Sequence, residues 1–439
     1  MRSPNLVTLF FKEWRELLGS RSYWLLLLMI GPLVGHGFIT AVEFYAEASG
    51  SGGGPAALSQ GLTPLDGILA PTFGAYDLAA TFLLPFVAIR LISGEKQSGG
   101  LKLLLQLPGS LTTKMAAKGL ALLTGWFFAL VAGLLAIVLW KTYGGHLYGP
   151  ETMNLLLGHL FRMVLSAGIA VAAAALAESA ASAAIVTLGF TVSTWALEFV
   201  AAYRGGFLEQ LASYTPTAAL RFFEQGLLRL STAIVMLAIG VAGFVLAGIW
   251  LHTGRTIKVR ALATVVAIGF LALVIIFAAN LRTSWDVSEN HRNSFSRADE
   301  TTLEQIQAPL RVTVFLAPED PRLSDFEQNV LKKLRRVLPH LDVVYSASGQ
   351  SGLFENNGDQ YGEIWYEMNG QRQMDRSTIE EVVLDNIYKL AGVLPPATSD
   401  DHVSAGYPLA TRAKGAALIF YGLWPLGTVL LWWLLRRIL

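Results

Sequence analysis

Two ionisable side chains, Arg162 and Glu198, lie inside long apolar stretches of the sequence. A charge at membrane depth is costly, so such residues are candidates for function. Arg162 falls in an expected span at about 154–177, and Glu198 falls near the end of the next span, at about 181–203. If these spans turn near residue 179, the two side chains are about 17 and 19 residues from the turn and lie at similar depth. We therefore expect an ion pair between them, with a role in a substrate path as the alternative.

No other group of reactive side chains has the spacing of a catalytic or metal-binding motif. The chain has no cysteine, and its seven histidines are scattered without a His-x-x-x-His or Glu-x-x-His pair. The glycine-rich stretch at 49–54 lacks the Gly-Lys-Ser/Thr ending of a phosphate loop, and no Gly-x-Ser-x-Gly motif is present. We expect no catalytic residue, no metal site and no bound cofactor in this chain, and any ATP hydrolysis must come from another polypeptide.

The composition is that of a membrane protein with one acidic insert. Hydrophobic residues make up 53% of the chain and charged residues only 15%, and several apolar runs exceed the roughly 18–20 residues needed to cross a bilayer. Residues 282–401 carry 20 acidic and 12 basic side chains, whereas the remainder carries 12 acidic and 21 basic ones. A basic membrane body reflects orientation in the bilayer, so we expect no nucleic-acid partner.

Hydropathy predicts a mainly α-helical membrane protein, a polytopic bundle of about eight transmembrane helices. Residues 205–229 are broken by Pro216 and predict two short outer helices or a re-entrant hairpin. With the N-terminus inside, the cytosolic segments hold thirteen Lys and Arg residues and the short outer segments hold four, which places both termini in the cytosol and residues 282–412 outside. The expected spans are at about 23–41, 74–92, 115–140, 154–177, 181–203, 230–251, 261–281 and 414–435.

The stretch at 93–114, between the second and third spans, is both charged and apolar. It holds Glu95 and several lysines that are too polar for lipid, together with leucines that are too apolar for water. A short helix with one apolar face accommodates both the charged residues and the leucines if that face binds another protein. Gly99-Gly100 loosens its start and Pro108-Gly109 ends it. The alternative is an ordinary cytosolic loop that rests on lipid headgroups.

Residues 4–20 predict a second amphipathic helix, which we expect to lie on the cytosolic leaflet. Its charged residues, Lys12, Glu13, Arg15 and Glu16, are expected to face away from an apolar stripe. That stripe consists of Val7, Phe10, Phe11, Trp14, Leu17 and Leu18.

The segment from Glu95 to Lys118 resembles the pattern Glu-Arg-x-x-Gly-Thr-Leu-x-Leu-Leu-x-x-Pro…Lys of the membrane subunits of type 2 ABC transporters, the mainly exporting class. In that family the segment is the coupling helix, which docks in a groove of the ATP-binding subunit. The sequence departs from the pattern at Gln97, Ser98 and Gly100. The resemblance implies that coupling to the ATPase involves Glu95, Lys96, Leu101, Leu103, Leu104, Leu107, Pro108 and Lys118.

The same family has an N-terminal interface helix, which resembles residues 4–20 and implies interface roles for Lys12, Glu13 and Trp14. Membership would further imply a separate ABC ATP-binding subunit in two copies that binds ATP and Mg, and a second permease copy in a homodimer. The chain would then be a permease that exports or extracts a substrate across the cytoplasmic membrane. The alternative is a non-transporting membrane scaffold whose outer domain recruits an envelope partner in an ATP-gated way.

The acidic insert predicts a small folded α/β domain. We expect a capped helix start at Ser296, strands at 310–316 and 341–345, a helix at 323–338, and a closing helix at 377–391. Asn369-Gly370 is the strongest short hairpin signal and joins strands at 363–368 and 371–375.

Residues 280–336 resemble the start of the auxiliary subunit of gliding-motility-type ABC transporters, through Asn280-Leu-Arg, Asp286-Val-Ser-Glu-Asn-His-Arg and Ser294-Phe-Ser. The last two spans and their insert would then be a shortened auxiliary subunit fused to a permease, although that family's outer region is much longer. The expected domains are a cytosolic interface helix at 1–22, a six-span permease core at 23–251, a linker and seventh span at 252–281, an extracytoplasmic α/β domain at 282–412, and an eighth span with a cytosolic tail at 413–439.

Overall fold

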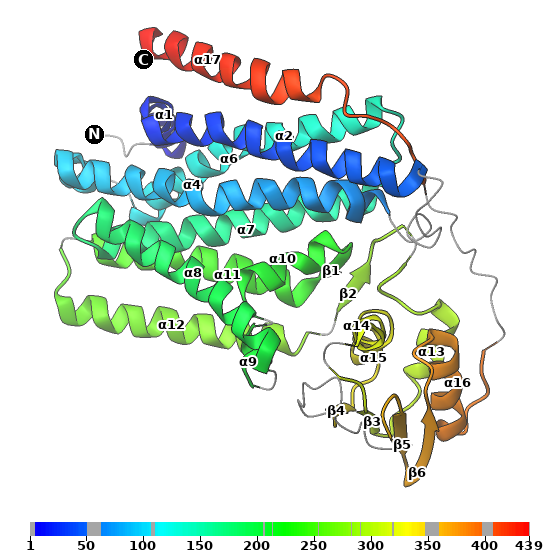
Figure 1. The fold of residues 1–439 in the computed structure, drawn as a ribbon. Coiled ribbons are helices and arrows are strands. Elements are labelled where there is room, and N and C mark those ends of the chain that lie inside the picture. The colour runs from blue at the N-terminus through cyan, green and yellow to red at the C-terminus, as the bar shows by residue number, and fades with distance from the viewer. Residues whose placement is uncertain are drawn as a thin grey trace. The chain divides into compact units, whose positions relative to one another are not determined.

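The computed structural model contains two compact units (Figure 1). The membrane unit comprises Met1–Val287 and Ala405–Leu439. The second unit comprises Ser288–Ser404, and we call it the outer unit after the location that the sequence predicts for it. The structure describes residues 5–50, 63–106, 110–204, 207–212, 214–252, 254–281, 283–289, 291–317, 320–346, 360–396 and 407–438.

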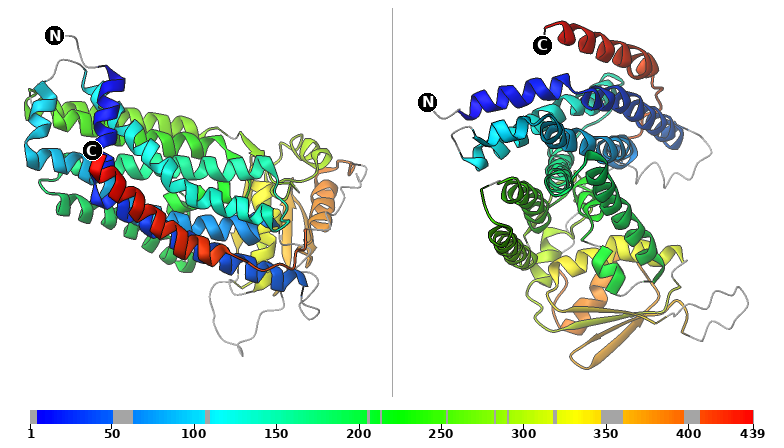
Figure 2. Two further views of the ribbon diagram at one scale, coloured as in Figure 1. Left: turned by 90° about the horizontal axis from the view of Figure 1, so that it is seen from above. Right: turned by 90° about the vertical axis from the view of Figure 1, so that its left-hand side faces the viewer.

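Eight helices among the described residues are long and apolar enough to cross a membrane. They lie alongside one another in the membrane unit (Figures 1 and 2). The first two spans are longer than the sequence predicts, because helical structure continues beyond the apolar run into polar residues on either side. The spans are α2 (Arg21–Gly50), α4 (Ala70–Ser98, preceded by the π-helical turn Leu65–Leu69), α6 (Leu111–Thr142), α7 (Gly149–Leu176), α8 (Ala180–Arg204), α11 (Leu230–Leu251), α12 (Ile257–Ala279) and the pair η3 (Leu418–Leu423) and α17 (Trp424–Ile438).

Helices α7 and α11 approach each other closely because glycines face each other at their contact. A Cβ atom on Gly168 would lie 2.1 Å from the carbonyl oxygen of Gly240, and one on Gly243 would lie 2.2 Å from that of Gly168. Small residues of this kind let helix backbones pack in a membrane without a driving force from water. By contrast, α12 and α17 lie at opposite edges of the unit and bury little of their surface, as expected of helices that face lipid (Figure 1).

Short elements follow α8, as the sequence predicts for residues 205–229. They are α9 (Phe207–Ala212) and α10 (Pro216–Glu224), and Thr215 caps α10 by accepting a hydrogen bond from the backbone N–H of Ala218. A two-stranded antiparallel pair comes next, which no local sequence pattern predicts; it joins β1 (Leu227–Arg229) to β2 (Ser284–Asp286).

The outer unit contains a four-stranded sheet in the order β4-β3-β5-β6, in which β3 and β4 are parallel and the other pairs are antiparallel. The predicted hairpin at Asn369-Gly370 is confirmed, and both residues have the positive φ that its turn requires. Ser296 caps the first helix by accepting from the N–H of Asp299, also as predicted. The elements are α13 (Arg297–Leu303), β3 (Leu310–Val314), α14 (Pro321–Phe326), η2 (Glu327–Leu331), α15 (Lys332–Val337), β4 (Leu341–Tyr345), β5 (Ile364–Met368), β6 (Gln371–Asp375) and α16 (Glu380–Ala391).

Candidate functional site

The charged stretch after the second span is helical from its start rather than a loop. Helix α4 continues to Ser98, so Glu95 and Lys96 lie in its last turn. Gly99 then adopts φ of 76°, a conformation that favours glycine, and the chain turns into α5 (Gly100–Gln106). Two residues assigned by resemblance, Leu107 and Pro108, lie outside the described residues.

If another protein bound the whole apolar face of α5, all of its leucines would have to face outward. They do not. Leu101 and Leu104 are only 7% and 6% exposed and pack into this chain's own core, whereas Leu103 is 68% exposed. Lys102 beside it is also exposed. The surface that α5 offers to another protein is therefore centred on Leu103.

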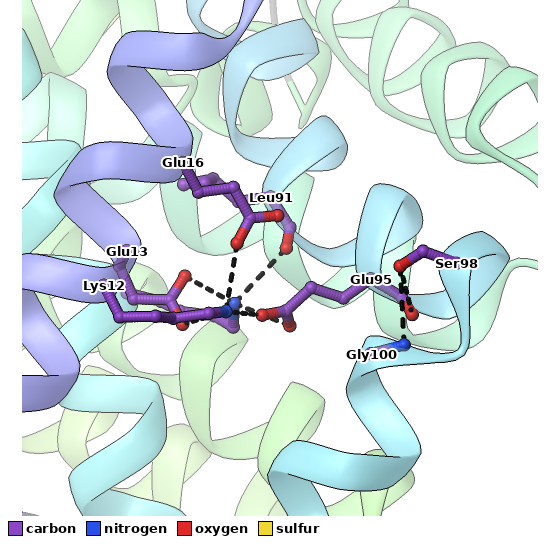
Figure 3. A network of polar contacts seen from close by, with 8 residues as sticks. Lys12, Glu13, Glu16, Leu91, Glu95, Ser98 and Gly100 are labelled. Carbon is purple, nitrogen blue, oxygen red and sulfur yellow. Dashed lines mark hydrogen bonds and ion pairs between the residues drawn. The ribbon is translucent and has the colours of Figure 1, made fainter. Parts of the chain in front are cut away.

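Helix α1 (Leu6–Gly19) is joined to α4 and α6 by a cluster of charged side chains, of which Glu13, Glu95 and Lys118 are buried. We name it the α1 charge cluster, and its other two members are Lys12 and Glu16 (Figure 3). The Nζ atom of Lys118 lies 2.7 Å from Glu13 Oε2 and 2.8 Å from Glu95 Oε2, and it also donates to the carbonyl of Leu91 at 3.3 Å. Lys12 Nζ lies 3.1 Å from Glu13 Oε1 and 3.0 Å from Glu16 Oε2, and it also contacts Glu95.

The position of Glu13 corrects the expectation that it faces away from the apolar stripe of α1. Its side chain is 1% exposed, because Lys118, which is 0% exposed, neutralises it inside the protein. Burial raises the pKa of Glu13 above its ordinary value, while the Lys118 ammonium acts in the opposite direction. Burial alone would lower the pKa of Lys12, but its contacts with Glu95, Glu13 and Glu16 raise it.

Aromatic packing fixes the other side of α1. Trp14 stacks on Phe128 of α6 with ring centroids 5.5 Å apart. Val7 and Phe11 remain exposed on the same helix. The predicted apolar stripe is thus divided between α6 and the surface of the chain.

The three carboxylates of the α1 charge cluster lie within 4.8 Å of one another, which is close enough to share a metal ion. The ammonium group of Lys12 contacts all three carboxylates, and that of Lys118 contacts Glu13 and Glu95. A dication would have to displace a buried lysine, so the arrangement suits a charge-balanced link between helices better than a metal site.

Lys96 points away from this cluster and closes the end of α7. Its Nζ donates to the carbonyl oxygens of Ala174, Ala175 and Ala177, at 2.7, 2.7 and 3.0 Å. The last carbonyls of a helix have no partner within the helix and carry partial negative charge, so a lysine is a favourable cap. The α4–α5 junction is therefore tied to α7 as well as to α1.

The expected ion pair between Arg162 and Glu198 is wrong. Arg162 Nε lies 3.4 Å from Asp77 Oδ1, and its Nη2 donates to Thr81 Oγ1 at 3.2 Å; both partners are on α4. Glu198 instead pairs with Arg221 of α10 at 3.3 Å. Similar depth in the membrane is not enough to predict a contact between two residues. The Arg162 side chain on α7 faces α4, whereas Glu198 near the end of α8 faces α10.

Asp77 is a functional candidate that was not predicted from the sequence, although it is the only acidic residue within the apolar run 70–94. Tyr76 and His159 are buried near Asp77. Neither the Tyr76 hydroxyl nor His159 Nε2 has a hydrogen-bond partner among the described residues. Burial and the charge of Asp77 raise the pKa of Glu224, on α10, to about 7.

A small polar pocket of about 10 Å³ lies beside Arg162, between α4, α7 and α8. Hydroxyl groups contribute much of its wall, and its volume is about that needed for one water molecule. Its polar lining consists of Thr81, Arg162, Ser166, Thr187, Thr191 and Thr194.

A comparison with curated proteins finds no match, and neither does a comparison with solved structures. A family model described as ABC-2 family transporter protein matches residues 7–251, from α1 through α11. This match includes both polar sites described above and more than half of the 439 residues. The chain therefore belongs to the ABC-2 family of transporter proteins, the membrane-spanning permeases of type 2 ABC transporters.

Proposed function

We propose that this chain is the permease subunit of an ATP-driven exporter and that it moves when a separate ATPase binds α1 and α5. The observation that carries the proposal is the α1 charge cluster, which ties α1 to the end of α4 immediately before α5. A push on the exposed surface around Leu103 would reach three spans through these contacts, because α4, α6 and α7 meet at this junction.

In this proposal the chain supplies no catalytic group, in keeping with its place in a permease family. Two copies of the ATPase would bind ATP and Mg, and two copies of the permease would form a homodimer. Closing of the ATPase pair would shift the spans between inward-facing and outward-facing arrangements as a rigid-body switch. The small polar pocket beside Arg162 is the place in the described spans where a polar part of a substrate would find donors.

The proposed location is the cytoplasmic membrane, with both termini in the cytosol and the outer unit outside. The distribution of Lys and Arg between the two sides supports this orientation. The sequence resemblance to gliding-motility-type transporters supports a fusion of permease and shortened auxiliary subunit. The outer unit would then contact an envelope protein, and a scaffold without transport activity is the second candidate function.

The test is co-purification of the ATPase with the full-length chain. Leu103→Asp should release the ATPase while leaving membrane insertion intact, because this side chain is exposed and makes no core contact. The matched control is Leu394→Asp, an exposed leucine of the outer unit, which should leave co-purification unchanged. Retention of the ATPase by Leu103→Asp would contradict docking at α5, and a stable ATPase complex that drives no substrate movement would favour the scaffold.

A further inference from the structure

A groove of about 620 Å³ lies on the membrane unit between α6, α7 and α11, and it shares no lining residue with the small polar pocket beside Arg162. Met163, Val164 and Ala167 of α7 line it between α6 and α11. Two glycines widen it, Gly119 on α6 and Gly248 on α11. The wall is almost wholly apolar, which is typical of a surface filled by hydrocarbon rather than by water.

The length of the groove matches one leaflet of a bilayer. Along α6 it extends from Leu111 to Leu123, which at about 1.5 Å per residue is roughly 18 Å. The hydrocarbon core of a bilayer is about 30 Å thick, so one leaflet contributes about 15 Å. The groove begins at the first turn of α6 and does not continue to its far end. A single lipid of one leaflet would fill it along its length.

The polar end of the groove is basic. His252 and Arg255, in the turn between α11 and α12, line this end, and the side chain of Arg255 is exposed with no hydrogen-bond or ion-pair partner among the described residues. No Asp or Glu occurs in residues 111–142 or 230–281, which form α6, α11 and α12. The Arg255 charge is therefore not neutralised by these helices.

We propose that this groove binds one anionic phospholipid, with an acyl chain between α6 and α11 and the phosphate on Arg255. A guanidinium presents paired donors that match a phosphate, and His252 adds a further donor beside it. The turn that carries both residues lies at the end of a span, where headgroups are found. The charge and the one-leaflet length together select an anionic lipid over a second protein chain.

The experiment is native mass spectrometry of the full-length chain in detergent, titrated with phosphatidylglycerol or with phosphatidylcholine of the same acyl chains. We expect one retained phosphatidylglycerol and about tenfold weaker retention of it by Arg255→Gln, the loss of one exposed charge-assisted contact. Lys258→Gln is the matched control, because this lysine is exposed nearby but does not line the groove, and it should retain the lipid.

Gly248→Leu tests the apolar part of the groove. A Cβ atom there would lie 3.7 Å from Met115 Cγ, an ordinary contact, so the larger side chain can occupy the groove without a backbone clash. We expect it to lose the bound lipid while its melting temperature in lipid-free detergent stays near that of the wild type. Equal retention of the two lipids, equal loss in Lys258→Gln, or full retention by Gly248→Leu would overturn the proposal. Loss of a dimer mass in Gly248→Leu would instead assign the groove to a second copy of the chain.

Discussion

Replacing Lys118 by methionine should destabilise the membrane unit by about 3–5 kcal/mol, the usual cost of breaking a buried ion pair by removing one partner. The ammonium group lies 2.7 Å from one carboxylate and 2.8 Å from another, those of Glu13 and Glu95, which are 1% and 4% exposed. Lys12 is the remaining cation of the cluster, and its side chain is 42% exposed. Methionine keeps most of the aliphatic volume of lysine, so the effect reports the lost charge.

A double-mutant cycle separates this charge effect from a general packing defect. Glu13→Gln alone should be milder, because Lys118 keeps its contact with Glu95. The Lys118→Met change leaves two carboxylates, Glu13 and Glu95, without this partner, and the double variant removes one of them. The double variant should therefore lose less stability than the sum of the two single variants, by about 1–3 kcal/mol, as for residues in direct contact. At about 2–4 °C per kcal/mol for domains of 150–250 residues, Lys118→Met should lower Tm by on the order of 10 °C.

The assay is thermal unfolding of the detergent-solubilised chain, followed by tryptophan fluorescence. Lys141→Met is the matched control, since Lys141 lies on the same helix, α6, but is exposed at its far end. Its Tm should equal that of the wild type. If Lys118→Met melts at the same temperature as this control, or if the cycle is strictly additive, the α1 charge cluster does not hold α1 in place and the reasoning is refuted.

Two further predictions concern the partners of Arg162 and Glu198, and a carboxylate of the outer unit. Arg162→Leu should cost about 3–5 kcal/mol because it strands Asp77, whereas Glu198→Gln should cost at most about 1 kcal/mol because its partner is exposed; equal losses in Tm would contradict this assignment of partners. In the outer unit, hydrogen bonds from Arg322 and Tyr361 lower the pKa of Asp320 from 3.8 to about 2. Stability from this carboxylate is present above pH 3.8 and is lost as pH falls toward 2, so Asp320→Asn should flatten the pH dependence of unfolding there, and an unchanged profile would exclude the effect.

Local sequence signals predict the elements well because each depends on nearby residues. The apolar runs mark the spans, Gly99 marks the break between α4 and α5, and Asn369-Gly370 marks the hairpin. The lengths of the first two spans are underestimated, because helical hydrogen bonding continues past the residues that face lipid. The β1–β2 pair is not predictable in the same way, since its strands come from segments more than 50 residues apart.

The buried charges show what a single sequence leaves undetermined. Amphipathic patterning places Glu13 on the outer face of α1, because an unpaired buried carboxylate is costly. Its partner Lys118 is 105 residues away in the sequence, and no local pattern joins the two. The same holds for Arg162, whose partner Asp77 is 85 residues away on a helix that is not its neighbour in sequence. The pairing of helices has to be known before such charges can be matched.

Helix α4 contacts α7 through polar groups at two levels, and these two contacts determine which spans can move as one body. Asp77 holds Arg162 of α7 near one end of α4, and Lys96 holds the last carbonyls of α7 near the other. The two contacts are 19 residues apart on α4, or roughly 28 Å at 1.5 Å per residue. Links at two such distant levels resist both sliding and rotation, whereas a single link would resist neither fully. The α1 charge cluster adds α1 and α6 to this pair at the level of Glu95. If an ATPase pushes on α5 as proposed, these four helices should move together, and relative motion should occur where α8, α12 and α17 bury less of their surface.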